Sequence, residues 1–295
     1  MIDPIPIVGR VRARLSDQYV FPEVAAEIAD RLAARAADYP TDLPALAAAV
    51  TADLQSVNGD QHLRLVHHVE PLAERTEGDD AVEWAEMATW AATTGGGVAS
   101  VQHVPGNIGV IEIAPLLFPV ALCGEAITAA MTLVADSSAL ILDLRGCLGG
   151  DPYMVAFVAS YLWDREPVEL SGIRSRDREV QAWTSSYVPG RRFGKERPVY
   201  VLTSAATFSG GEALAYDLKS IGRATLVGER TRGGANPRVS FRVHPHLEAM
   251  IPTGTSQHPV TGDNWEGVGV APDVPTGADD ALDTAHQLAL ASIAA

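Results

Sequence analysis

The chain has 295 residues, of which 47% are hydrophobic and 20% are charged, a balance typical of a globular protein with a sizeable core. Its formal net charge is −15 and no basic stripe runs along it, so we expect neither a nucleic-acid partner nor a membrane partner. Cys123 and Cys147 belong to no Cys-x-x-Cys pair, which argues against a disulfide framework or a zinc cluster. The beginning of the chain resembles no secretory signal and no long apolar span occurs, so we expect a cytoplasmic protein.

The first part of the chain is expected to be helical. Val24, Ile28 and Leu32 recur at helical spacing, and after a proline-rich break Leu46 and Val50 do the same. We therefore expect a small N-terminal helical domain over residues 1–58 and an α/β domain over residues 59–295.

His62 follows a turn at the end of the helical part and precedes the alternating run 63–66, which predicts a strand. A histidine in such a turn is either simply solvated or able to face a cleft. His67 and His68 lie within the predicted strand and are weaker candidates for a function.

The middle of the chain predicts a connection followed by core elements. Residues 70–97 are polar and then glycine-rich, so we expect a connecting hairpin or a mobile loop there. Strands are expected at 98–104 and 108–113, and a helix at 121–133.

Residues 139–145 give the clearest pattern of a buried strand, and they run into a glycine-rich turn that contains Gly149 and Gly150. Turns at the ends of buried strands are where α/β proteins place ligand contacts, so these glycines are candidate donors to an oxyanion. The alternative is a tight turn into a helix at 154–162.

Residues 164–198 are charged and irregular, and we expect a long excursion there that could act as a lid. The next stretch, 199–222, predicts a short strand, the sequence Ser209-Gly210-Gly211-Glu212 and a helix that ends at Gly222. A serine at this junction would have backbone N–H groups beside it, as a nucleophile requires. Alternatively, Ser209 and Glu212 form only a capping box.

Towards the end, a strand is expected at 224–228 and a hairpin at 238–243 and 248–252. Glu266 follows in a glycine-broken segment, flanked by Trp265 and Gly267, and an amphipathic helix is expected over 279–293.

Four stretches together resemble the family of C-terminal processing (tail-specific) proteases, and within it the branch of the tricorn core and the interphotoreceptor retinoid-binding protein. They are spread in order over about four-fifths of the chain, which makes the set specific. The stretches are Gly59–His62, Asp143–Gly150, Thr207–Glu212 with Val227–Thr231, and Asn264–Asp273.

This resemblance implies a ClpP/crotonase-like α/β core after a helical domain, and serine-type peptide hydrolysis. Ser209 takes the place of the family's nucleophile, and the N–H groups of Gly210 and of Gly149 or Gly150 take the place of its oxyanion hole. The interval between His62 and Asp143 is too short for a PDZ domain, so we expect none.

The family divides on its general base. Gly234 stands where the processing proteases carry a catalytic lysine, and the lysines of this chain, Lys195 and Lys219, match no such position. The tricorn branch uses a histidine after the helical region and a late glutamate, which match His62 and Glu266.

We therefore expect a serine peptidase with a Ser209–His62–Glu266 triad that acts through an acyl-enzyme. Arg145, Phe208 and Trp265 stand beside the motif residues and are candidates for contacting the substrate. Two alternatives stay open: a non-catalytic binder of apolar ligands, and a hydrolase or acyltransferase for a small metabolite. No metal or organic cofactor is expected, the partner is a peptide or small acyl substrate, and a homo-oligomer is left open.

Overall fold

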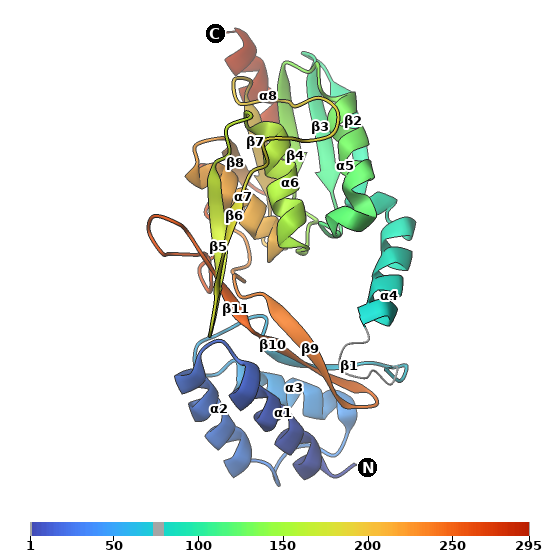
Figure 1. Cartoon of the computed structure of the whole chain (residues 1–295), viewed down its shortest axis with the longest axis vertical. Coiled ribbons are helices and arrows are strands. Elements are labelled where there is room, and N and C mark those ends of the chain that lie inside the picture. The colour runs from blue at the N-terminus through green and yellow to red at the C-terminus, as the bar shows by residue number, and fades with distance from the viewer. Residues whose placement is uncertain (1, 73–79, 295) are drawn as a thin grey trace. The chain divides into compact units, whose positions relative to one another are not determined.

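The computed structural model describes residues 2–72 and 80–294. The chain forms two compact units, each assembled from three stretches of sequence (Figure 1). Unit 1 comprises Met1–Asp79, Ile173–Val180 and Asn236–Gln257, and unit 2 comprises Asp80–Gly172, Gln181–Ala235 and His258–Ala295. Each unit is described by itself.

Unit 1 begins with the helices α1 (Pro4–Gln18), α2 (Pro22–Ala34) and α3 (Leu43–Leu54). Each starts with a proline in its first turn, where the missing N–H group costs no hydrogen bond. Asp3 and Asp42 cap α1 and α3 by accepting hydrogen bonds from the N–H groups of Ile5 and Ala45. The predicted N-terminal helical domain is therefore present, and its first helix, α1, precedes the residues whose periodicity indicated helix.

The helices of unit 1 pack on an antiparallel sheet of order β1-β10-β9. Its strands are β1 (Arg64–His67), β10 (Leu247–Pro252) and β9 (Arg238–His244). Leu65, Leu247 and Ile251 are buried in one core with the apolar faces of the three helices. Strands from a later part of the chain thus join the helical region, whereas the sequence placed them in the second domain.

Unit 2 is organised around a six-stranded sheet of order β12-β8-β7-β4-β3-β2. All neighbouring pairs are parallel except β2 and β3. The strands are β2 (Val98–Val104), β3 (Ile108–Ile113), β4 (Ala139–Asp143), β7 (Val199–Thr203), β8 (Thr225–Gly228) and β12 (Val274–Pro275). The central strands β4 and β7 are buried along their whole length, as the apolar runs of the sequence predicted.

Helices cover both faces of this sheet. The side chains of alternate strand residues, such as Leu140 and Val201, pack with α5 (Val120–Leu133), α6 (Pro152–Leu162) and α7 (Gly210–Ser220). Their neighbours, such as Ile141 and Leu202, pack with α8 (Ala281–Ala294). The expected fold class, an α/β core preceded by a small helical domain, is confirmed, and no PDZ domain occurs among the described residues.

Two sequence predictions for the connections were wrong. Residues 80–93 form the helix α4 (Asp80–Thr93), followed by a short 3-10 turn, η1 (Gly95–Gly97), rather than a loop. Trp90 of α4 packs edge-on against Phe118, with 5.4 Å between the ring centroids. Within the expected irregular excursion, β5 (Glu169–Ser175) and β6 (Glu179–Trp183) form a three-stranded sheet with β11 (Gly254–Gln257).

None of the helices described here combines the length and the apolar character that crossing a membrane would require.

Candidate active site

Ser209 lies at the junction between β7 and α7, with an unusual backbone conformation. Its φ and ψ are 50° and −117°, and among the described residues only Asn107 shares a positive φ without being glycine. A residue that merely caps a helix normally has an extended backbone. A backbone conformation as rare as that of Ser209 costs about 1–3 kcal/mol. The turn therefore holds Ser209 in a strained position that capping alone does not need.

The glycine-rich turn lies directly beside Ser209. It follows β4, which pairs in parallel with β7 and brings Asp143 opposite Leu202. A methyl group built on Gly149 would lie 3.0 Å from Cβ of Ser209, and one built on Gly210 would lie 2.8 Å from the backbone nitrogen of Gly150. Only residues without side chains allow the two turns to approach so closely.

Backbone hydrogen bonds hold this glycine turn from one side. The N–H group of Leu117 donates to the Gly149 carbonyl over 2.9 Å, and the N–H group of Asp151 donates to the Leu117 carbonyl over 2.7 Å. The N–H groups of Gly149, Gly150 and Gly210 make no hydrogen bond to any residue that the structure describes. The structure thus brings the predicted nucleophile together with the predicted oxyanion donors, and leaves these donors available to a ligand oxygen.

Cys147 links the two turns. Its carbonyl accepts a hydrogen bond from the N–H group of Phe208 over 3.0 Å, and its sulfur lies 3.0 Å from where a methyl group on Gly211 would be. Burial raises the pKa of the Cys147 thiol to about 11. The thiol is therefore neutral at pH 7 and serves as packing rather than as a nucleophile.

Glu212 is completely buried on the first turn of α7. Its carboxylate accepts hydrogen bonds from the N–H groups of Ser209, Gly233 and Gly234, and from the hydroxyl of Thr231. Burial raises the pKa of Glu212, and these hydrogen bonds oppose that rise. The glutamate half of the predicted capping box is therefore formed, as part of a larger network.

Glu266 is bonded to the loop 231–235, which also binds Glu212. Its Oε2 accepts a hydrogen bond from the N–H group of Ala235, and its own N–H group donates to Oδ1 of Asn264 over 2.8 Å. The indole of Trp265 donates to the Gly234 carbonyl over 2.9 Å. Ser209 and Glu266 thus belong to one hydrogen-bonded assembly within unit 2.

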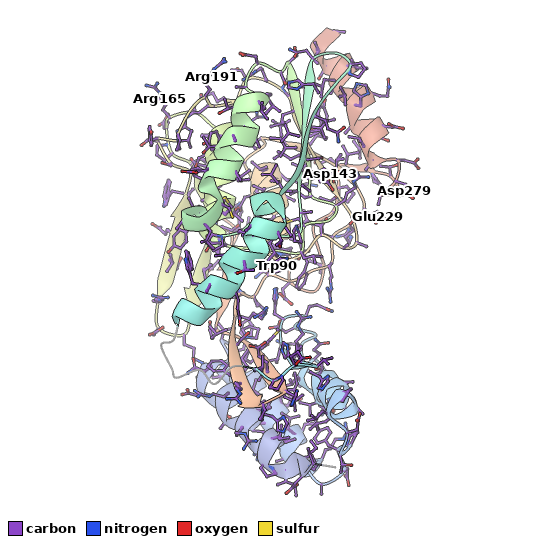
Figure 2. The ribbon with its side chains drawn as sticks, turned by 90° about the vertical axis from the view of Figure 1, so that its right-hand side faces the viewer. Trp90, Asp143, Arg165, Arg191, Glu229 and Asp279 are labelled. Atoms are coloured by element: carbon purple, nitrogen blue, oxygen red, sulfur yellow. The ribbon has the colours of Figure 1, made fainter. Side chains whose placement is uncertain are left out.

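The three predicted substrate contacts differ in accessibility. Phe208 and Trp265 are 5% and 2% exposed. Trp265 belongs to the core of unit 2, and the guanidinium of Arg232 lies over the ring of Phe208. Arg145 is bound to both carboxylate oxygens of Asp143, which Figure 2 labels, and also donates to a backbone carbonyl. Contact of these residues with substrate stays a prediction.

His62 lies in unit 1, where its turn is firmly built. His62 is only 4% exposed, so the alternative of a simply solvated histidine in a turn is wrong. The N–H group of His62 donates to Oδ1 of Asp60 over 3.0 Å. The other Asp60 oxygen accepts from the Tyr19 hydroxyl and from the Asn236 amide, each over 2.9 Å. Burial raises the pKa of Asp60.

Sequence reasoning missed Asp60 and Thr231 as supporting residues. Asp60 stands within the quoted stretch before His62, and Thr231 within the stretch after β8, so both lay inside the motifs. Their partners, Asn236 and Glu212, are distant in sequence, and no local pattern indicates such a pairing.

Two family models match the chain. The model of Peptidase family S41 matches residues 107–276, and the model of the N-terminal domain of this peptidase in eukaryotic IRBP matches residues 5–94. The first match spans more than half of the chain and includes the Ser209 turn, the glycine turn and Glu266.

Solved structures share the fold. A putative peptidase from Parabacteroides merdae has a TM-score of 0.68 at 16% identity, over 98% of this chain and 98% of that chain. The photosystem II D1 C-terminal processing protease has a TM-score of 0.55 at 14% identity, over 95% and 94%. The tricorn protease has a TM-score of 0.62 at 13% identity, over 99% of this chain and 37% of its own.

At these identities the solved structures show the fold alone, whereas the match to the family model shows membership of the family. The chain belongs to Peptidase family S41 and is accordingly a serine peptidase.

Proposed function

We propose that this chain hydrolyses peptide bonds through an acyl-enzyme, with Ser209 as the nucleophile, His62 as the general base and Glu266 as the carboxylate partner of His62. The observation that carries this proposal is the strained Ser209 beside N–H groups that no described residue engages. His62 and Glu266 are assigned on their positions in the sequence motifs.

In this proposal, Oγ of Ser209 attacks the peptide carbonyl carbon while His62 accepts the hydroxyl proton. The oxygen that gains the negative charge is stabilised by the N–H groups of Gly210 and of Gly149 or Gly150. His62 then gives its proton to the departing amine, and the acyl group stays on Ser209. A water molecule, deprotonated by His62, releases the acid and restores the serine.

A carboxylate on the second ring nitrogen of the histidine would fix its tautomer and stabilise its charged form. No lysine is available for a serine–lysine pair at the family position, because Gly234 stands there and its N–H group is bound to Glu212. The histidine route is therefore the one that the residues of this chain favour.

Labelling with a fluorophosphonate probe tests the nucleophile. We expect the wild type to be labelled on Ser209, Ser209→Ala to lose labelling, and Ser220→Ala, a change at an exposed serine near the end of the same helix, to keep it. We expect His62→Ala and Glu266→Gln to slow labelling. Equal labelling of the wild type and Ser209→Ala would refute the assignment.

A substrate screen separates the proposed activity from its alternatives. Peptides, esters and small amides are offered to the wild type and to Ser209→Ala. Ser209-dependent cleavage of peptides supports the proposal, whereas turnover of small esters without peptides would indicate a metabolite hydrolase. Retinoid binding that is unchanged in Ser209→Ala, without any labelling, would indicate a carrier of apolar ligands.

A further inference from the structure

The carboxylate of Glu212 makes more contacts than a helix cap requires. Oε2 accepts from the N–H group of Ser209 over 2.9 Å and from that of Gly234 over 2.8 Å. Oε1 accepts from the N–H group of Gly233 over 2.6 Å and from the hydroxyl of Thr231 over 2.5 Å. The side chain thus joins the nucleophile turn to a loop about 20 residues later in the sequence.

These partners require an ionised carboxylate. Three of them are backbone N–H groups, which can only donate, and they address both oxygens of Glu212. The Thr231 hydroxyl also donates to Glu212, and its oxygen accepts a hydrogen bond from the N–H group of Val270 over 2.7 Å. A protonated acid or an amide would place a hydrogen against at least one of these donors, which leaves a buried group unsatisfied.

The same loop is bonded to the segment that carries Glu266. The N–H group of Gly267 donates to the Gly233 carbonyl over 3.1 Å, and the indole of Trp265 donates to the Gly234 carbonyl. Directly after Gly234, the N–H group of Ala235 donates to the Glu266 carboxylate itself. Gly234, the last residue bonded to Glu212, and Ala235, which is bonded to Glu266, are therefore consecutive in the chain.

We propose that Glu212 is a positioning residue that locks the Ser209 turn to the loop 231–235 and thereby to Glu266. This inference rests on the proposed function, because Glu212 is inferred to fix the distance between two members of the proposed triad, Ser209 and Glu266. Glu212 does not touch the reacting atoms; it acts through the backbone of residues 209 and 233–235.

Kinetics of Glu212→Gln test this role. The variant keeps the size of the side chain but turns an NH₂ group toward backbone donors. We expect kcat to fall about 100-fold, as misplacement by about 1 Å can cause, with KM nearly unchanged, because the binding surfaces are not altered. Thr231→Ala removes one of the four hydrogen bonds without altering α7, and we expect a smaller loss with the same split.

Asp217→Asn is the matched control. Asp217 is also buried on α7, but its carboxylate accepts from the N–H group and hydroxyl of Ser171 and not from the Ser209 turn. We expect this variant to keep kcat and KM. An equal loss of kcat in both variants would show a general disturbance of α7 and overturn the proposal.

Hydrogen exchange measured by mass spectrometry tests the coupling without reference to activity. In Glu212→Gln we expect faster exchange in residues 207–213, 231–236 and 264–270, and no such change in Asp217→Asn. Unchanged exchange at 264–270 would overturn the link to Glu266. An inactive wild type would refute the proposed function, and the exchange pattern would still decide whether Glu212 couples these segments.

Discussion

Gly149 and Gly150 are neighbours in one turn, but a methyl group added to each would meet different atoms. On Gly149 it would lie 3.0 Å from Cβ and 3.5 Å from Oγ of Ser209. On Gly150 it would lie 2.2 Å from the backbone carbonyl oxygen of Leu117. The φ angles of the two glycines are 135° and 137°, a conformation that residues with a side chain disfavour. Gly149 therefore lies beside the Ser209 side chain, whereas Gly150 lies against the backbone of Leu117.

We expect Gly149→Ala to fold and to lose about 10²-fold or more in kcat, because the methyl group crowds the Ser209 hydroxyl and shifts an oxyanion donor. Gly150→Ala is expected to lower the free energy of unfolding by several kcal/mol, about 3 or more, because a backbone carbonyl cannot move aside. Urea unfolding and single-turnover acylation separate the two effects. A stable, fully active Gly149→Ala would contradict this division.

Asp217 illustrates a buried carboxylate outside the active site. Burial raises its pKa from 3.8 to about 6, and the hydrogen bonds from Ser171 only partly oppose that rise. A folded-state pKa above the unfolded value means that the stability from this group is full below about pH 4 and is lost as the pH rises through about 6. At pH 7 the ionised Asp217 therefore destabilises the fold.

We expect Asp217→Asn to be more stable than the wild type at pH 7 and to lose this advantage at pH 4. The difference between 3.8 and about 6 corresponds to an upper value on the order of 3 kcal/mol. Urea unfolding of both proteins between pH 4 and 8 measures it, with Asp283→Asn on the exposed face of α8 as a control. A stability difference that does not change with pH would contradict the assignment.

At the scale of elements, the segment 184–198 is fixed by arginine side chains rather than by regular structure. Arg223 is buried and donates to the backbone carbonyls of Leu162, Gly194 and Arg197. Arg197 in turn donates to the carbonyls of Ala135 and Ser137. Burial lowers the pKa of Arg223 to about 10, so the guanidinium stays charged at pH 7. This segment is ordered because a cation satisfies its carbonyl groups.

We expect Arg223→Met to lower the free energy of unfolding by about 3 kcal/mol, because three carbonyl groups lose a charged donor. Trypsin is expected to cut faster at Arg191 and Lys195 in this variant. Arg165→Met is the control, because Arg165, labelled with Arg191 in Figure 2, is exposed. Unchanged cleavage in Arg223→Met would show that other contacts order the segment.

Elements with a strong local pattern were predictable from the sequence. The buried strands β4 and β7 and the helices α5 and α7 follow from their apolar runs and periodicity. The alanines of helix α4 favour a helix. The helix was nevertheless missed, because the polar stretch before it and the glycine-rich stretch after it indicated a loop. Strands β5 and β6 were missed because their residues are mostly exposed or half-buried and show no clear alternation.

The candidate site divides in the same way. Ser209, Gly149, Gly150 and Gly210 were predicted together from the resemblance to the protease family. Their turns follow β7 and β4, which the structure shows to be adjacent parallel strands. The wider role of Glu212 was not predicted. Its partners at 231–234 are backbone groups, which carry no sequence signal, and only the folded chain shows them.

At the scale of the whole molecule, unit 1 combines the N-terminal region with stretches from much later in the chain, among them Asn236–Gln257. Leu247, Ala249 and Ile251 of β10 are at most 1% exposed and belong to the core that α1, α2 and α3 form. The turn of His62 has the same dependence, because the Asp60 carboxylate is held by Asn236. The helices of the N-terminal region therefore lack a complete core until the later strands have been added.

From this we expect residues 1–79 alone not to fold, because β1 would lose its partner strand and the helices one side of their core. A chain in which 236–257 follows 1–79 through a glycine linker should regain a cooperative thermal transition, measured by circular dichroism. The same chain with Leu247→Asp should lose it, because a charge would enter a fully buried position. A cooperative transition in residues 1–79 alone would show that the helices suffice, and that the region around His62 can form without the strands of residues 236–257.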